Sequence, residues 1–261
     1  MIHMNENLEE YDNPQQYDRE NQYDVDTQWL IQFANRLDHC QHIIDLACGT
    51  GRIAIPLAQQ GYTVTGIDLH AGMLQEAKHK AQLAGVPETR LQWLEQDCCN
   101  FYTPHSADLL LMNGNAFQHF HTNEQQDQLL RAISSHLRTD GYMVMDMRFP
   151  SNDELMQPEG EDYWKTVTDA HTGLPVDLYT LSSYDALQQM QHYITIRKFR
   201  DIHGTIQREE RSNIYLRYTY PQELERLLAS HGLAVIHRYQ DWNGTPLTKN
   251  ASQMIYVCRK R

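Results

Sequence analysis

The feature that most constrains the fold of this chain is a regular alternation of short apolar stretches with helical periodicities between residues 42 and 147. Parallel strands need a crossover of a dozen or more residues, which is usually a helix. This rhythm is therefore typical of a parallel sheet with right-handed crossovers, and the chain is predicted to be an α/β protein. The expected strands are residues 42–47, 62–67, 91–94, 107–112 and 141–147, and the expected helices are residues 52–60, 71–83 and 124–137.

The alternation stops after Pro150. Residues 151–220 instead show a period of two and short turns, which predicts a β-rich antiparallel insertion. The α/β pattern then resumes and closes the chain. The expected strands of the insertion are residues 176–181, 192–199 and 205–217, followed by a helix at 222–230 and two last strands at 234–239 and 253–258.

These patterns divide the chain into three regions. Residues 40–150 and 221–261 make up the α/β domain, and residues 1–39, a polar tail followed by a helix, are a candidate lid over a pocket. Residues 151–220 are either a roof over a substrate or the interface of a homodimer. An aromatic roof would favour a cationic amine, and the insertion holds seven of the 15 tyrosines, namely Tyr163, Tyr179, Tyr184, Tyr193, Tyr215, Tyr218 and Tyr220.

Composition narrows the class of partner. The chain has 22 basic and 34 acidic residues, and a net charge of −12 disfavours nucleic acid, whose phosphates select a basic surface. The five cysteines form no Cys-x-x-Cys pair, so neither a metal site nor a disulfide framework is expected. The N-terminus does not read as a signal peptide, and no apolar run is long enough to span a membrane. We therefore expect a cytoplasmic protein with no membrane partner.

A glycine-rich turn follows the first expected strand. Gly49 and Gly51 stand between this strand and the next helix, where glycine lets a ligand approach the backbone closely. Asp68 lies nineteen residues after Gly49, at the end of the second strand, where a carboxylate can accept both hydroxyls of a ribose. The spacing Gly49-x-Gly51-x-x-Ala54 also fits a nicotinamide dinucleotide site.

Two further acids separate these interpretations. Asp45 lies beside the turn, where it would repel a pyrophosphate by about 1–4 kcal/mol but would attract a cationic ligand. Asp97 follows the third strand, where it can accept a hydrogen bond from the amino group of an adenine. Three acids at the carboxyl ends of three successive strands favour a positively charged adenosine cofactor without phosphate.

Residues 40–147 resemble the core of class I S-adenosylmethionine (SAM)-dependent methyltransferases. Asp45–Gly51 matches the glycine-rich first motif of that family, and residues 113–115 resemble its segment after the fourth strand. The resemblance implies a Rossmann-like sheet of seven strands in the order 3-2-1-4-5-7-6, with SAM as cofactor and S-adenosylhomocysteine as product. The cofactor-binding residues that it implies are Asp45, Ala47, Gly49, Gly51, Asp68, Leu69, Met73, Asp97, Cys98 and Asn113.

Two histidines follow the fourth strand. This stretch is similar to that of amino-sugar and glycine N-methyltransferases, and the similarity implies that His119 touches the substrate and acts as the catalytic base. His121 is the alternative base, and a purely structural role for His119, with His121 solvated, stays open. We expect methyl transfer to a nitrogen or oxygen of a small-molecule acceptor. The other open functions are a nicotinamide-dependent oxidoreductase and a non-catalytic SAM-binding sensor or partner.

Overall fold

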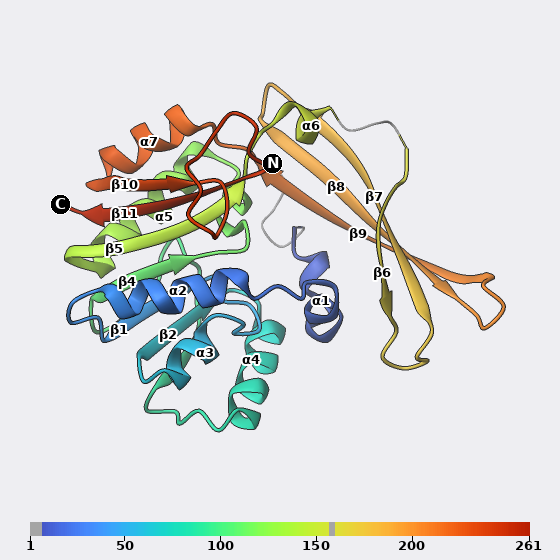
Figure 1. The fold of residues 1–261 in the computed structure, drawn as a ribbon, viewed down its shortest axis with the longest axis horizontal. Coiled ribbons are helices and arrows are strands. Elements are labelled where there is room, and N and C mark those ends of the chain that lie inside the picture. Colours follow the sequence, from blue (N-terminus) through green and yellow to red (C-terminus); the bar gives the residue numbers. More distant parts are fainter. Residues whose placement is uncertain (1–6, 157–159) are drawn as a thin grey trace.

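The computed structural model describes residues 7–156 and 160–261. Residues 1–6 of the predicted lid and residues 157–159 of the predicted insertion lie outside this part of the chain. The α/β domain contains a seven-stranded sheet and its helices (Figure 1). Its elements are α2 (Val25–Arg36), β1 (His42–Leu46), α3 (Ala54–Gln59), β2 (Thr63–Asp68), α4 (Ala71–Leu83), β3 (Leu91–Glu95), β4 (Ala107–Met112), η3 (Ala116–His119), α5 (Asn123–His136), β5 (Leu137–Arg148), α7 (Pro221–Ser230), β10 (Leu233–Tyr239) and β11 (Gln253–Lys260).

The strand order confirms the predicted topology. The sheet runs β10-β11-β5-β4-β1-β2-β3, and β10 and β11 are its sixth and seventh strands along the chain. Strands β1 to β5 pair in parallel, whereas β11 is antiparallel to both of its neighbours. One prediction was wrong in its bounds: β5 begins at Leu137, directly where α5 ends, and not at Gly141.

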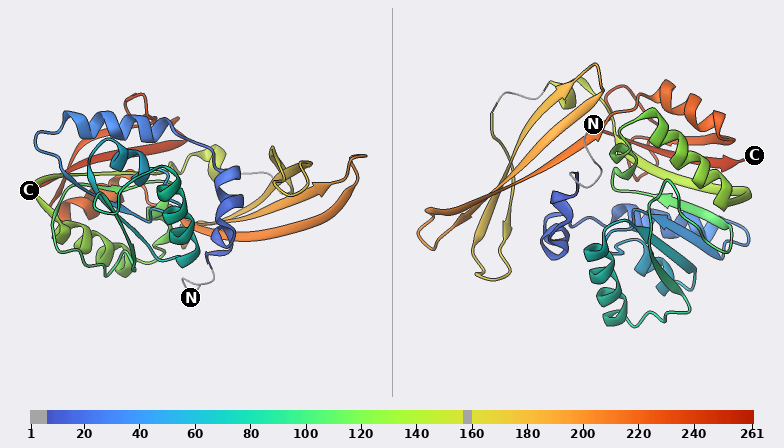
Figure 2. Two further views of the ribbon diagram at one scale, coloured as in Figure 1. Left: turned by 90° about the horizontal axis from the view of Figure 1, so that it is seen from below. Right: turned by 180° about the vertical axis from the view of Figure 1, so that it is seen from behind.

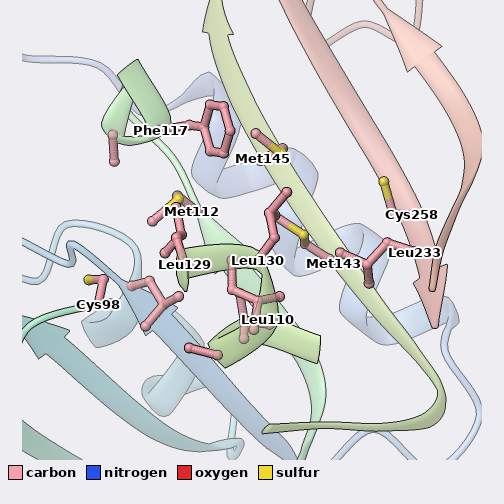
Figure 3. Packing of buried hydrophobic residues seen from close by; sticks show 14 of the residues in the cluster. Cys98, Leu110, Met112, Phe117, Leu129, Leu130, Met143, Met145, Leu233 and Cys258 are labelled. Carbon is pink, nitrogen blue, oxygen red and sulfur yellow. The ribbon is translucent and has the colours of Figure 1, made fainter. Parts of the chain in front are cut away.

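Two apolar layers hold the sheet between its helices. One layer joins strand residues such as Leu110 and Met143 to α5 and α7, and Figure 3 shows Leu129 and Leu130 of α5 packed over them. The other layer joins Ile43, Leu111 and Val144 to α2 and α3. Because alternate residues of a strand face opposite sides of a sheet, this division fixes which side chains at the strand ends point toward α2 and α3.

The insertion is a second sheet, and its antiparallel character confirms the prediction. It contains β6 (Asp162–Thr168), β7 (Pro175–Asp185), β8 (Met190–Arg200) and β9 (Ile206–Arg217), paired in that order. Strand β6 and the short helix α6 (Asn152–Leu155) were not predicted. The sheet extends away from the α/β domain as a twisted blade, which the two views of Figure 2 show from below and behind.

The N-terminal segment is ordered where only a polar tail was predicted. It forms η2 (Glu9–Tyr11) and α1 (Pro14–Glu20), and it lies between the α/β domain and the blade (Figure 1). Helix α1 begins because the side chain of Asn13 accepts a hydrogen bond from the Gln16 N–H and Pro14 occupies the first turn. Helix α1 contacts α4 on one side, and η2 contacts β9 on the other.

Candidate active site

A cavity opens at the carboxyl ends of the parallel strands, where the glycine-rich turn lies. It encloses about 1220 Å³ of empty space, part of which is open to solvent. The ends of β1, β2, β3 and β4 form its floor, and residues 7–21 of the N-terminal segment cover it. Every residue predicted to bind the cofactor lines this cavity except Gly51, and so do His119 and His121.

Asp68 holds the glycine-rich turn in place. Its carboxylate accepts hydrogen bonds from the N–H groups of Gly49 and His70, both at 2.8 Å. Burial raises the pKa of Asp68, and these two hydrogen bonds oppose that shift. Each carboxylate oxygen keeps a further lone pair, so Asp68 can accept hydroxyl groups of a ligand while it positions the turn.

Gly51 serves packing rather than ligand approach. Its φ is +79°, and a Cβ atom there would lie 2.5 Å from the Trp93 ring. Gly49, with φ +54°, does line the cavity, and a Cβ on it would lie 3.2 Å from the end of Met73. Of the two glycines predicted to contact the cofactor, only Gly49 lines the cavity, because the turn directs Gly51 toward β3.

The residues at the predicted adenine end of the site lie together beside β3. Asp97 accepts a hydrogen bond from the Cys99 N–H at 2.8 Å, which orients its carboxylate at the cavity wall. Met73 and Cys98 are buried next to it, and Leu69 is exposed at the cavity edge. The arrangement offers one acidic acceptor beside apolar surface, which is what an adenine ring requires.

Both ring nitrogens of His119 make hydrogen bonds. The amide of Asn7 pairs with the backbone N–H and C=O of Tyr215, which fixes its orientation, and its Nδ2 then donates to His119 Nδ1 at 2.9 Å. A neutral imidazole carries one proton, so Nε2 carries it and donates to the Tyr11 hydroxyl at 2.9 Å. Loss of solvation lowers the pKa of His119 to about 4. In this arrangement His119 has no free lone pair for a substrate proton.

His121 differs from both sequence interpretations. Its Nε2 donates to the Tyr215 carbonyl at 2.9 Å, so the ring is not simply solvated. Its Nδ1 has no hydrogen-bond partner within residues 7–156 and 160–261. Burial lowers the pKa of His121 as well, which keeps the ring neutral at pH 7.

The sequence indicated residues 1–39 as a candidate lid but did not identify which of them line the cavity. Asn7, Tyr11, Tyr17, Asp18 and Asn21 all line it. Their local signal is the Asn13-Pro14 helix start between two tyrosines, which marks a helix but not its docking site.

Asp18 ties this cover to the glycine-rich turn. Its carboxylate accepts a hydrogen bond from the Thr50 hydroxyl and one from Lys80 Nζ, both at 2.6 Å. Because Thr50 belongs to the turn and Lys80 to α4, the cover is fastened directly to the side of the cavity formed by the glycine-rich turn.

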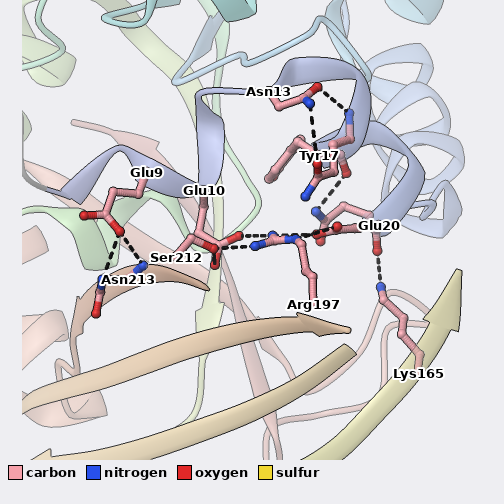
Figure 4. A network of polar contacts seen from close by, with 11 residues as sticks. Glu9, Glu10, Asn13, Tyr17, Glu20, Lys165, Arg197, Ser212 and Asn213 are labelled. Carbon is pink, nitrogen blue, oxygen red and sulfur yellow. Dashed lines mark hydrogen bonds and ion pairs between the residues drawn. The ribbon is translucent and has the colours of Figure 1, made fainter. Parts of the chain in front are cut away.

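The insertion holds this cover from behind. Arg197 of β8 bonds to Glu20 through Nε and Nη2 at 2.7 Å, and its Nη2 also reaches Glu10 at 2.7 Å (Figure 4). Among the residues that the structure describes, none between 151 and 220 lines the cavity. The cavity is thus covered by residues 7–21 and not by the expected roof, and the insertion supports the cavity wall from outside, through these residues and through the Tyr215 carbonyl at His121.

Comparison with known proteins agrees with this geometry. Residues 43–141 match the family model described as a methyltransferase domain. A solved structure of an S-adenosylmethionine-dependent methyltransferase from Clostridium acetobutylicum has the same fold, with a TM-score of 0.77 and 19% identity over 94% of this chain and 96% of that one. The chain carries a class I methyltransferase domain.

Relatives of this methyltransferase domain act on several kinds of molecule. Human glycine N-methyltransferase is 30% identical over 133 residues, which are 46% of this chain and 44% of that protein. CalS10, described as an amino pentose methyltransferase from Micromonospora echinaspora, gives a TM-score of 0.69 and 20% identity, covering 91% of this chain and 89% of its own. The chain spans half or less of the length of the curated relatives it matches.

The cofactor of this methyltransferase family, SAM, fits the residues present. Asn113 is 7% exposed, and both polar atoms of its side chain are buried in the cavity wall without a partner in the described chain. Such atoms cost about 1–3 kcal/mol each unless a ligand pairs them. Asp45 is also buried there, and SAM would bring an ammonium group and a carboxylate.

Two other findings bear on partners. Within residues 7–156 and 160–261, no group of three or more His, Cys, Asp or Glu side chains is arranged to hold a metal ion. In the same part of the chain, no helix has the length and apolar character needed to cross a membrane.

Proposed function

We propose that this chain transfers the methyl group of SAM to a nitrogen of a small-molecule acceptor. The observation that carries the proposal is one cavity that unites the glycine-rich turn, the acids Asp45, Asp68 and Asp97, and an aromatic wall of Tyr11 and Tyr17. Aromatic faces and surplus acidic charge favour a cationic amine over a phosphate or carboxylate substrate. The names of glycine N-methyltransferase and the amino pentose methyltransferase support nitrogen over oxygen.

Different residues at the strand ends bind different parts of SAM in this proposal. Bound SAM supplies a methyl group on a positively charged sulfur, already activated for in-line displacement. In the proposal Asp68 accepts the ribose hydroxyls, Asp97 accepts from the adenine amino group, and Asp45 and Asn113 receive the amino-acid end. Alignment of two reactants can lower a barrier by roughly 7–11 kcal/mol, so positioning is the main contribution asked of this chain.

The acceptor proton is assigned to His121 rather than His119. Within residues 7–156 and 160–261, Nδ1 of His121 has no hydrogen-bond partner, whereas the hydrogen bonds from Asn7 and to Tyr11 occupy both nitrogens of His119. His119 then acts as a positioning residue, because it anchors the cover over the acceptor. The insertion supports the cover, and a homodimer formed through its sheet stays a prediction that a molar-mass measurement by light scattering tests.

The test combines binding with turnover. SAM or S-adenosylhomocysteine at 100 times its dissociation constant should stabilise the fold by about 2.7 kcal/mol, which a thermal shift detects, and NAD(H) should not. Incubation with SAM and a panel of primary and secondary amines should yield S-adenosylhomocysteine, measured by mass spectrometry. Stabilisation by a dinucleotide alone would overturn the proposal. SAM binding without turnover on any amine or alcohol would instead indicate a sensor.

A further inference from the structure

A polar row crosses three neighbouring strands beneath the cavity. Asp45 of β1 is level with Leu111 of β4 and Val144 of β5, two residues of the apolar layer that faces α2 and α3. Two residues further along β4 and β5, and so on the same face, come Asn113 and Asp146, which together with Asp45 make up the polar row. All three are buried, with exposed fractions of 2% for Asp45, 7% for Asn113 and 4% for Asp146.

The groups facing this row leave an excess of negative charge. Asp26 of α2 is buried and makes a two-pronged ion pair with Arg52, at 2.5 and 2.7 Å. Arg52 is the cation that acts on both Asp45 and Asp146, and Asp68 adds further negative charge beside Asp45.

Hydrogen bonds satisfy Asp146 without neutralising it. Its carboxylate accepts from the Gly114 N–H and from Gln253 Nε2, both at 2.7 Å. On the other side, Tyr23 and the half-buried Asp241 complete the charged and titratable surroundings of the row. Three acids, Asp26, Asp45 and Asp146, thus share a single guanidinium.

The unpaired side chain of Asn113 indicates that a ligand binds beside this row. Asn113 follows β4, the strand between those that carry Asp45 and Asp146, lines the cavity, and has both Oδ1 and Nδ2 buried and unpaired within the described chain. A partner must therefore present a donor and an acceptor together. The acids require that the donor be a cation, and an α-amino acid group, with its ammonium and carboxylate, meets both conditions.

We propose that Asp26, Asp45 and Asp146 make binding of the cofactor proton-coupled. Without ligand, these carboxyl groups hold a proton, which leaves to solvent when the ammonium of the cofactor enters the cavity. The inference rests on the proposed function and adds Asp26 and Asp146 to its site. No covalent bond changes in this step. The incoming positive charge replaces the proton that had neutralised the row.

The pKa values of the carboxyl groups in the row agree with this proposal. Burial raises the pKa of Asp45 to about 7 and that of Asp146 to about 6, and the negative charge of Asp26 acts in the same direction on both. A neighbouring ammonium lowers both pKa values. Ligand binding must therefore strengthen as the pH rises through 6 and 7 and become independent of pH above about 8.

Isothermal titration calorimetry in buffers of different ionisation enthalpy tests the coupling on the intact protein. S-adenosylhomocysteine, which keeps the amino-acid end, should release about one proton at pH 6.5 and almost none at pH 8, and its dissociation constant should be on the order of tenfold weaker at pH 6 than at pH 8. The matched probe is 5′-methylthioadenosine, which has the adenosine and thioether but lacks the amino-acid end. It should bind with no proton release.

Variants locate the proton. Asp45→Asn should remove most of the release at pH 6.5, whereas Asp140→Asn, an exposed acid paired with Arg259, should leave it unchanged. Binding of S-adenosylhomocysteine without proton release, or equal release with 5′-methylthioadenosine, would overturn the coupling and leave the proposed function intact. Failure of both SAM and S-adenosylhomocysteine to bind at any pH would overturn the proposed function itself. The wild-type measurement decides the matter even where a variant does not fold.

Discussion

Arg197→Met should release the cover of the cavity while leaving the α/β domain folded. The Arg197 side chain is 6% exposed and bonds to Glu20 and Glu10, which belong to the N-terminal segment. Removing one partner from a buried ion pair costs about 3–5 kcal/mol, because the remaining charges stay buried and unpaired. Here both carboxylates can reach water if α1 and η2 swing away. The cost therefore appears as local opening of residues 7–20 rather than as unfolding of either sheet.

Hydrogen exchange followed by mass spectrometry measures that opening. A loss of about 3 kcal/mol corresponds to on the order of 100-fold faster exchange of the α1 amides. The cofactor should also dissociate faster, since the cover includes Tyr17 and Asp18 of the cavity wall. Exchange of the β1 and β4 amides should not change. Both strands belong to the core of the α/β domain, with which Arg197 makes no hydrogen bond or ion pair in the described part of the chain.

Arg211→Met is the matched control. Arg211 lies on β9, the strand next to Arg197, but its side chain is 51% exposed and pairs with Glu209. Exposed ion pairs contribute about 0–1 kcal/mol, so the control should leave α1 protected. Equal exchange of α1 in the two variants would refute the view that Arg197 fastens the cover.

Three further predictions follow from the site. Asp68→Ala should weaken SAM binding by about 2–4 kcal/mol, measured by calorimetry, and should also lower the melting temperature of the ligand-free protein, because the Gly49 N–H loses its acceptor; unchanged SAM affinity would remove Asp68 from the site. Gly51→Ala should destabilise the protein by about 1–3 kcal/mol in a denaturant titration, owing to the +79° φ and the Trp93 ring, and a neutral result would contradict the packing role. His121→Asn should lower kcat most at low pH, where the acceptor amine is protonated, whereas His119→Asn should mainly raise the KM of the acceptor; the reverse split would restore His119 as the base.

Much of the fold could be predicted because its signals are local. The strand and helix periods between residues 42 and 147 come from which side chains face the core, and the glycine-rich turn is visible as Gly49 and Gly51. The order of the sheet came from the family resemblance and is confirmed. Strand β6 was missed because its residues are mostly exposed, which leaves no apolar alternation to detect.

The sequence by itself determined the sheet and the cofactor edge. The carboxyl ends of parallel strands meet at one edge, so acids that follow successive strands, such as Asp45, Asp68 and Asp97, must gather there whatever the rest of the chain does. That conclusion needs only strand order and position.

Only the tertiary structure decided what covers that edge and which groups are free to act. Glu20 and Arg197 are separated by 177 residues, and Asn7 and His119 by 112. Their pairing depends on how the blade and the N-terminal segment dock, and no local pattern encodes that. The same contacts fix the tautomer of His119 and leave Asn113 unpaired, because burial and hydrogen bonding are properties of the assembled cavity and not of a residue type.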